Sequence, residues 1–290
     1  MRSKPPKLRE KLNRLAEYYD RSFLDSDPIQ FPHRYKDPRD REIVAFIAAA
    51  LAYGNVKQIR ASVERVLLAM QQIDASPHRA ILKLSVPEHA GLFAEFKHRF
   101  NDGRDMVCLL YFLQQMLNRC GSIEGFFTQT GQRNNSLRER LESFTSNALR
   151  LDSVNIYNNC DSGLSDSADL PDNAGVRFFF TNPSDGSACK RLCMFLRWVV
   201  RRDDGVDLGL WTSLSPAQLM MPLDTHTTRI CYFNGLSPSP FATWRNAEFV
   251  TNELRRFDAN DPVRYDFALS RLGILRVRGA GASVRTSSKN

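Results

Sequence analysis

The chain has 290 residues, 42% of them hydrophobic, and its 40 Lys and Arg residues outnumber 32 Asp and Glu residues to give a net charge of +8. This apolar content suffices for a hydrophobic core and excludes wholesale disorder. No run approaches the roughly 18 consecutive apolar residues that span a bilayer. The first twenty residues are charged throughout and lack the apolar region of a secretory signal. The basic balance permits a polyanionic partner without identifying one.

The six cysteines are scattered without a CxxC pair. In a chain of this length they are typical of reduced thiols rather than of a disulfide framework. We therefore expect a cytoplasmic protein with no cysteine-based metal or iron–sulfur site and no bound cofactor.

Apolar residues recur at helical spacing along most of the chain. The run from Glu42 to Tyr53 is rich in alanine and nearly all apolar, which predicts a buried central helix that Gly54-Asn55 ends. Further helices are predicted over residues 8–19, 59–73, 105–119, 136–150, 188–202, 245–257 and 262–272. Because two-residue alternation is almost absent, we predict an all-α fold.

Two segments break this pattern. Residues 152–176 are rich in Asp, Ser and Asn, which predicts a polar loop or insertion. The C-terminal segment RVRGAGASVRTSSKN predicts a basic, flexible tail.

The segment Asn182–Cys193 (NPSDGSACKRLC) combines turn-forming residues with the start of a helix. We predict that Ser187 opens this helix and that Lys190 lies in its first turn. The free N–H groups of a helix N-terminus can bind phosphate, and Arg191 and Arg197 add positive charge. The alternative is an ordinary exposed lysine after a capped turn.

The segment Met221–Ile230 (MPLDTHTTRI) places Asp224 as the N-cap of a helix that runs to about Phe233. An N-cap needs no further function, so this segment alone assigns none. His226 has no metal-ligand spacing with the other four histidines, and we expect no metal site.

Together the two segments resemble the helix-hairpin-helix (HhH-GPD) DNA glycosylase superfamily, which contains endonuclease III and the 8-oxoguanine glycosylases. Gly186-Ser-Ala-Cys-Lys190 is similar to the family hairpin G-x-G-x-K, and Leu223-Asp-Thr-His-Thr-Thr-Arg-Ile230 is similar to its V-D-T-H-x-x-R segment. The resemblance extends over residues 178–273 and, more weakly, over residues 40–60.

The resemblance implies a two-lobed helical fold. One lobe is expected to be a helical bundle over residues 43–203 that carries the hairpin and the polar loop. The other is expected to combine residues 1–42 with residues 204–290 and to carry the catalytic aspartate. Lys190 and Asp224 would face the cleft between these lobes.

The sequence departs from the family pattern at several positions. Ala188 stands where the second hairpin glycine is expected, and the interval from Lys190 to Asp224 is longer than in endonuclease III-like members. The C-terminal four-cysteine cluster of those members is absent. Family members have a glutamine that fills the gap left in the DNA. Its position corresponds to about Gly54 in this chain, which leaves Tyr53 or Asn55 as its substitute.

By this resemblance Lys190 is the nucleophile that attacks C1′ of an extruded nucleotide, and Asp224 stabilises positive charge on the sugar. A lysine nucleophile implies strand cleavage after base release. If Lys190 does not reach C1′, Asp224 and a water molecule suffice for base release alone. The residues expected to contact DNA are Gly186, Ser187, Ala188, Arg191, Tyr53, Asn55 and His226. The aromatic residues considered for the base pocket are Trp198 and Trp211.

The expected partner is double-stranded DNA that carries a damaged or modified base, and the protein is expected to act as a monomer. Its substrate would be an oxidised base, in repair, or a hypermodified base such as a modified phage cytosine, in antiviral defence. Two alternatives stay open: a non-catalytic helix-hairpin-helix DNA-binding module and a helical protein–protein scaffold.

Overall fold

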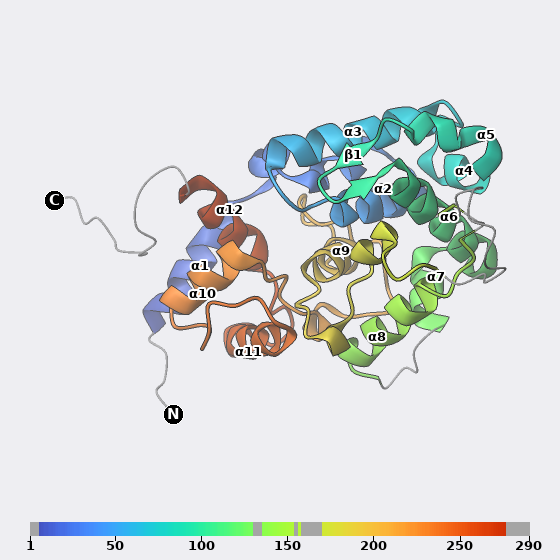
Figure 1. The fold of residues 1–290 in the computed structure, drawn as a ribbon. Coiled ribbons are helices and arrows are strands. Elements are labelled where there is room, and N and C mark those ends of the chain that lie inside the picture. Colours follow the sequence, from blue (N-terminus) through green and yellow to red (C-terminus); the bar gives the residue numbers. More distant parts are fainter. Residues whose placement is uncertain (1–5, 130–134, 154–155, 158–169, 277–290) are drawn as a thin grey trace.

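The computed structural model describes residues 6–129, 135–153, 156–157 and 170–276, and these are mostly helical, as predicted (Figure 1). The strands in this part of the chain form a single two-stranded antiparallel hairpin, β1 (Lys97–His98) and β2 (Asn101–Asp102). The α-helices are α1 (Pro6–Tyr18), α2 (Pro38–Ala50), α3 (Val56–Gln71), α4 (Pro77–Leu82), α5 (Val86–His89), α6 (Gly103–Cys120), α7 (Ile123–Gln129), α8 (Leu137–Ala148), α9 (Lys190–Val200), α10 (Thr225–Phe233), α11 (Trp244–Arg255) and α12 (Asp266–Arg276).

The alanine-rich segment forms the buried central helix α2. Asp37 caps it by accepting a hydrogen bond from the N–H of Arg39 at 2.9 Å, and Pro38 occupies its first position. Every residue from Glu42 to Ala50 is buried, and the small side chains let α2 pack closely against α9. After α2, Gly54 adopts a left-handed φ of 95°, which reverses the chain into α3.

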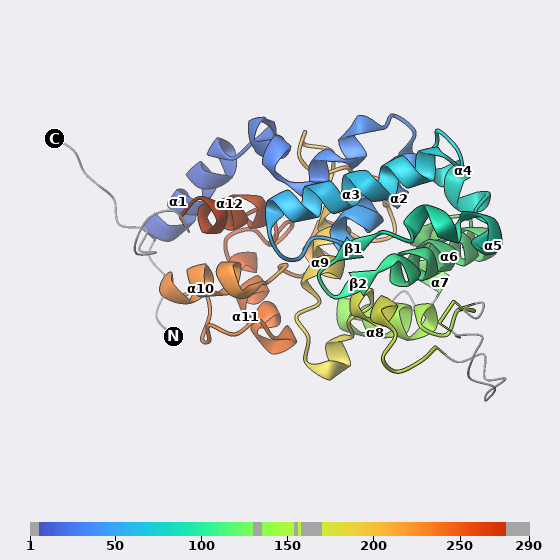
Figure 2. The same ribbon diagram turned by 45° about the horizontal axis from the view of Figure 1, so that its top comes forward.

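The helices form two groups (Figures 1 and 2). The helices α1, α10, α11 and α12 lie together on one side, and α12 contacts both α1 and α10. The helices α2 to α9 form the other and larger group, in which α2 packs on α9 and α6 packs on α7. One continuous hydrophobic core runs through both groups.

The packing does not follow the lobe boundaries expected at residues 42/43 and 203/204. Two short 3-10 turns before α2, Pro28–Gln30 and Pro32–Arg34, pack against α2 itself. Trp211 lies beyond the second boundary but packs on Phe127 and Phe195 of the larger group. The N-terminal helix α1 does contact the C-terminal helices, whereas residues 28–42 pack with the larger group.

Most of the predicted helices are present within a few residues of their expected ends. The β hairpin and the short helices α4, α5 and α7 were not predicted. Within residues 152–176, only 152–153, 156–157 and 170–176 fall in the described ranges. The expected C-terminal tail lies outside the described residues from position 277 onward. The cysteines of the described ranges, Cys108, Cys120, Cys189, Cys193 and Cys231, are free thiols. None of the described helices has the length and apolar character needed to cross a membrane.

Candidate functional site

A cleft of about 820 Å³ lies where the larger helix group meets α10 and α12. Its wall is formed by the α2–α3 turn, the tip of the β hairpin, the first turn of α10 and one face each of α9 and α12. The lining residues of α9 share one helical face, because Met194 lies one turn after Lys190, and Arg197 and Trp198 lie two turns after it. Of the residues predicted from the sequence, the cleft is lined by Tyr53, Asn55, Lys190, Arg191, Trp198, Asp224 and His226.

Lys190 is the first residue of α9. The preceding residue, Cys189, is in the left-handed region with φ 46° and ψ 38°, so the chain enters the helix abruptly. This conformation costs a non-glycine residue about 1–2 kcal/mol. The ammonium group of Lys190 donates to the carbonyl of Ala52, with Nζ and O 3.3 Å apart, and it lies 3.7 Å from Oδ2 of Asp224.

Asp224 is the N-cap of α10, as predicted, and its Oδ1 accepts from the N–H groups of His226 and Thr227 at 2.9 and 2.8 Å. Its other oxygen, Oδ2, points to Lys190. Burial alone would raise the pKa of Asp224, but the charge of Lys190 and the hydrogen bonds from Thr227 together hold it below its usual value. The side chains of Lys190 and Asp224 are 29% and 37% exposed, so a ligand in the cleft can reach both.

The first four residues of the predicted helix-hairpin-helix turn, 186–189, lie beside the cleft, and only its last residue, Lys190, is in the cleft wall. Gly186 is exposed and left-handed, with φ 76°, and its carbonyl accepts from the N–H of Trp244 at 3.1 Å. The expectation that Ser187 opens the helix is wrong. Ser187 forms an isolated antiparallel bridge with Thr243, and the residue before α9 is Cys189.

Ala188, the third hairpin residue, is buried in the core, so its side chain is not a DNA contact. Its φ is not positive, because the second left-handed position of the hairpin falls at Cys189 instead. An alanine is therefore compatible with this turn, where the family pattern has a glycine. Within the described residues no side-chain hydrogen bond caps α9, which leaves the N–H groups of its first turn available to an anion.

Arg191 is buried and makes its polar contacts within the protein, although it lines the cleft, so its assignment as a direct DNA contact stays a prediction. Its guanidinium donates to the carbonyls of Ala50, at 3.2 Å, and of Phe178, and it lies over the rings of Phe178 and Tyr53 at 4.0 and 5.1 Å from their centres. Burial lowers the pKa of Arg191 to about 10, so the group is still charged at neutral pH. Arg191 thus supports the floor of the cleft.

The remaining predicted contacts lie at the rim. Tyr53 is half-buried, and its hydroxyl bonds the carbonyl of His98 at 2.9 Å and Oδ1 of Asn101 at 2.5 Å. Asn55 is exposed and caps α3, and His226 is exposed in the first turn of α10. The β hairpin therefore holds Tyr53 in place, whereas Asn55 and His226 face solvent.

The two candidate pocket tryptophans have different surroundings. Trp198 lines the cleft, and its buried Nε1 has no hydrogen-bond partner among the described residues. Trp211 lies outside the cleft, packs against Phe127 and Phe195, and donates to Oε1 of Glu42 at 2.7 Å. Both rings belong to the hydrophobic core, and the expectation that Trp211 lines the base pocket is wrong because its side chain does not line the cleft.

Sequence reasoning noted the positive charge of Arg197 but missed its acidic partner and the second ion pair of the cleft wall. Arg197 contacts Asp266 at 2.5 Å, and Arg271 forms an ion pair with Asp27. All four residues line the cleft, and the partners of each pair are far apart in the chain. Burial raises the pKa of Asp266 to about 6, against the lowering effect of Arg197. The wall thus presents buried hydrogen-bonding groups beside the Lys190–Asp224 pair.

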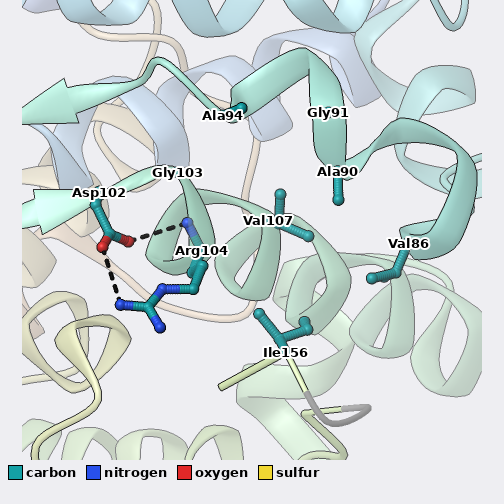
Figure 3. Close-up of a pocket in the computed structure, with 9 residues that line it drawn as sticks. All are labelled: Val86, Ala90, Gly91, Ala94, Asp102, Gly103, Arg104, Val107 and Ile156. Atoms are coloured by element: carbon teal, nitrogen blue, oxygen red, sulfur yellow. Dashed lines mark hydrogen bonds and ion pairs between the residues drawn. The ribbon is translucent and has the colours of Figure 1, made fainter. Parts of the chain in front are cut away.

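A second hollow, of about 420 Å³, lies beside the root of the hairpin (Figure 3). Val86, Val107 and Ile156 give it a mainly apolar lining. At its edge Asp102 caps α6 by accepting from the N–H of Arg104 at 3.0 Å. Its described lining contains no amine–carboxylate pair like that of the larger cleft, which we therefore regard as the candidate functional site.

The geometry defines a helical protein with an amine and a carboxylate facing each other across a cleft. Comparison with protein families shows that residues 27–275 match a family described as a protein of unknown function (DUF2400), and the chain belongs to that family. No curated protein and no solved structure matches the chain. Within the described residues, no group of three or more His, Cys, Asp or Glu side chains could hold a metal ion.

Proposed function

We propose that the protein is a DNA glycosylase that extrudes a damaged or modified base from double-stranded DNA into the cleft, with Lys190 as nucleophile and Asp224 as the catalytic carboxylate. The observation that carries the proposal is the approach of Lys190 Nζ to within 3.7 Å of Asp224 Oδ2 in the wall of a cleft of about 820 Å³. The two motifs that resemble the helix-hairpin-helix glycosylases supply these two residues. A cytoplasmic, monomeric enzyme without a bound cofactor belongs to the same proposal.

The lowered pKa of Asp224 suits it to charge stabilisation rather than to proton abstraction. As the C1′–N bond lengthens, the sugar gains positive charge, and an ionised carboxylate beside it lowers the energy of that state. Asp224 is then the nearby negative charge throughout the reaction.

The covalent step uses the free amine of Lys190. The lone pair of Nζ forms a bond to C1′ while the C1′–N bond breaks, and the base leaves with the bonding electrons and takes a proton from water. An Nζ proton then passes to O4′ while the C1′–O4′ bond opens with its electrons on O4′, which gives a protonated Schiff base between Nζ and C1′. Removal of a C2′ proton then expels the 3′ phosphate and cleaves the strand.

The cleft wall supports the binding of a polar, planar group. Trp198 is only 1% exposed, but it lines the cleft and its N–H has no partner among the described residues, so an acceptor group of a ligand that reached this wall would satisfy that donor. The Arg197–Asp266 pair adds donors and acceptors on the same side. Oxidised bases and hypermodified bases both fit this description, so repair and antiviral defence are both within the proposal.

Abasic DNA tests the nucleophile without knowledge of the base, because an abasic sugar already presents the C1′ aldehyde. Borohydride should trap a covalent complex of the wild type with abasic duplex DNA, and peptide mapping should place the link on Lys190. Lys190→Ala should abolish the complex, whereas Lys36→Ala, which removes an exposed lysine outside the cleft, should not. A complex that persists in Lys190→Ala would assign the nucleophile to another residue. Tight binding without a complex in any variant would favour a non-catalytic DNA-binding module.

A further inference from the structure

A group of exposed cations lies on α3 and on the β hairpin beside it. On α3 they are Lys57, Arg60 and Arg65, and on the hairpin they are Lys97 and Arg99. All five side chains are exposed, and none of them forms an ion pair with another described residue. We call these five residues the basic strip.

The acidic residues of the same two elements do not neutralise the basic strip. Glu64 is the acidic residue of α3, and it is paired with Arg34 at 2.8 Å, outside the strip. On the hairpin, Asp102 of β2 is paired with Arg104 at 3.4 Å. Because both carboxylates already face other cations, the strip keeps an excess of positive charge at the surface. Such an excess on one face is typical of a surface that binds a polyanion.

Contacts between α3 and the hairpin make the strip one surface. The buried His98 of β1 has Nδ1 2.8 Å from the hydroxyl of Ser62 on α3. Arg65 donates from Nη1 to the carbonyl of Glu95, just before β1, at 3.4 Å. Both views of the fold show β1 lying beside α3 (Figures 1 and 2). The backbone of the two elements therefore holds the five cations in fixed relative positions.

The strip begins at the edge of the cleft and leads away from it. Arg99 lines the cleft at the α2–α3 turn, where a Cβ atom on Gly54 would come within 2.7 Å of Arg99 Cδ. The first turn of α3 also lines the cleft, whereas its later turns do not. From Lys57 to Arg65 the helix rises about 12 Å at roughly 1.5 Å per residue, which is the length of three to four base-pair steps of about 3.4 Å. The strip therefore spans several successive phosphates of a duplex that passes the cleft.

Resting on the proposed function, we infer that the basic strip binds the phosphate backbone of duplex DNA on one side of the extruded nucleotide. Cations spread along a rigid surface suit a regular chain of phosphates, whereas a single small anion needs donors that converge on one point. Arg65, Lys97 and Arg99 lie outside the segments that resemble the glycosylases, so this contact is separate from the turn at residues 186–190. The strip and the start of α9 would hold the duplex at two places.

The test measures how the affinity for an unmodified DNA duplex changes with salt concentration in variants that lose the same number of charges. The strip variant carries Lys57→Gln, Arg60→Gln and Arg65→Gln, and glutamine has about the helix propensity of lysine and arginine, so α3 should still form. The control variant removes three exposed cations outside the strip and the cleft, through Arg9→Gln, Arg14→Gln and Lys36→Gln. Lys97→Gln tests the hairpin part of the strip without altering α3.

We expect the strip variant to reduce the slope of log affinity against log salt concentration by about 2 to 3, because each neutralised phosphate contributes about 0.9. Lys97→Gln should reduce the slope by about 1, and the control variant by less than about 1. A second experiment fixes the register with a tetrahydrofuran abasic analogue in the duplex. Cutting one flank to about two base pairs, fewer than the strip spans, should remove the difference between wild type and strip variant, and cutting the other flank should not.

Equal slopes for wild type and strip variant would overturn the inference, as would equal reductions in the strip and control variants. The same dependence on both flanks would overturn it too, because the strip lies on one side of the cleft. Tighter binding of duplex RNA than of duplex DNA, with the same change of slope, would assign the strip to RNA instead.

These outcomes are separate from the failure of the proposed function, because the salt titration uses unmodified DNA and needs no base release. A protein that shows the strip-dependent slope but releases no base and traps no abasic DNA would keep the strip and lose the glycosylase. A protein that releases a base with the same slope in wild type and strip variant would keep the glycosylase and lose the strip.

Discussion

Lys190 and Asp224 meet at the starts of two helices, with Nζ and Oδ2 3.7 Å apart, although a long stretch of chain separates them. The abrupt left-handed turn at Cys189 sets the position of the lysine, and hydrogen bonds from the first turn of α10 set that of the aspartate. The local backbone therefore positions each side chain independently of the contact between the two. The pair depends on how α9 and α10 pack in the complete fold.

The two roles of Asp224 can be separated by two substitutions. Asn caps a helix about as well as Asp, so Asp224→Asn should preserve α10, whereas Asp224→Ala should lower the free energy of unfolding by about 1 kcal/mol through loss of the cap. Both variants should keep most of their affinity for DNA. Urea unfolding together with a DNA-binding titration checks this prediction. Equal destabilisation of the two variants would show that the charge, not the cap, holds α10.

The pKa of Asp224 should depend on Lys190. Because the lysine charge is a main cause that lowers this pKa, Lys190→Met should move it upward. A carboxyl with a depressed pKa adds stability above the unfolded value of about 4 and loses it as the pH falls through the folded value. The wild type should therefore keep Asp224 ionised to a lower pH than Lys190→Met does, and the variant should lose stability at a higher pH on acidification. An NMR titration of the Asp224 carboxyl carbon measures both, and an unchanged midpoint would contradict the coupling.

The two tryptophans should respond differently to the same substitution. Trp211→Phe leaves the buried Glu42 carboxylate without one of its donors, so we expect it to cost about 1–3 kcal/mol more than Trp198→Phe in unfolding. Trp198→Phe removes a buried N–H that has no partner among the described residues, and it alone should weaken binding of DNA that carries the substrate base. Paired urea unfolding and binding measurements test this. A larger stability loss in Trp198→Phe would reverse the two assignments.

Arg99 should contribute to the salt dependence of DNA binding. Each phosphate that a cation neutralises adds about one to the slope of log affinity against log salt concentration, so Arg99→Gln should reduce that slope by about 1. Arg39→Gln is the matched control, because Arg39 is paired with Asp37 and lies outside the cleft. An unchanged slope in Arg99→Gln would place the phosphate contacts elsewhere.

Local rules predicted the elements that local interactions determine. The helical spacing of apolar residues located α2, α3, α6, α8, α9, α11 and α12, and the N-cap preference located the start of α10 at Asp224. The start of α9 was misplaced because a serine is a good N-cap by preference, whereas here the bridge from Ser187 to Thr243 holds it outside the helix. Strands of two residues are too short for alternation to show, so the hairpin escaped prediction.

The parts of the site that were missed depend on contacts between distant segments. Lys190 and Arg191 are adjacent cations, and only the packing of α9 against α2 decides that the second is buried while the first reaches the cleft. Likewise Trp211 finds Glu42 at a separation of 169 residues. No periodicity within one helix encodes such a pairing.

The most direct test of the central claim is mass spectrometry of the free bases released from DNA. A pool of oxidised, alkylated, deaminated and phage-modified duplexes would be incubated with wild type, with Asp224→Asn, and with Asp37→Asn, which alters an N-cap outside the cleft. We predict that wild type and Asp37→Asn release the same base and that Asp224→Asn releases none. Release by Asp224→Asn at the wild-type rate, or no release from any DNA despite salt-sensitive binding, would contradict the account.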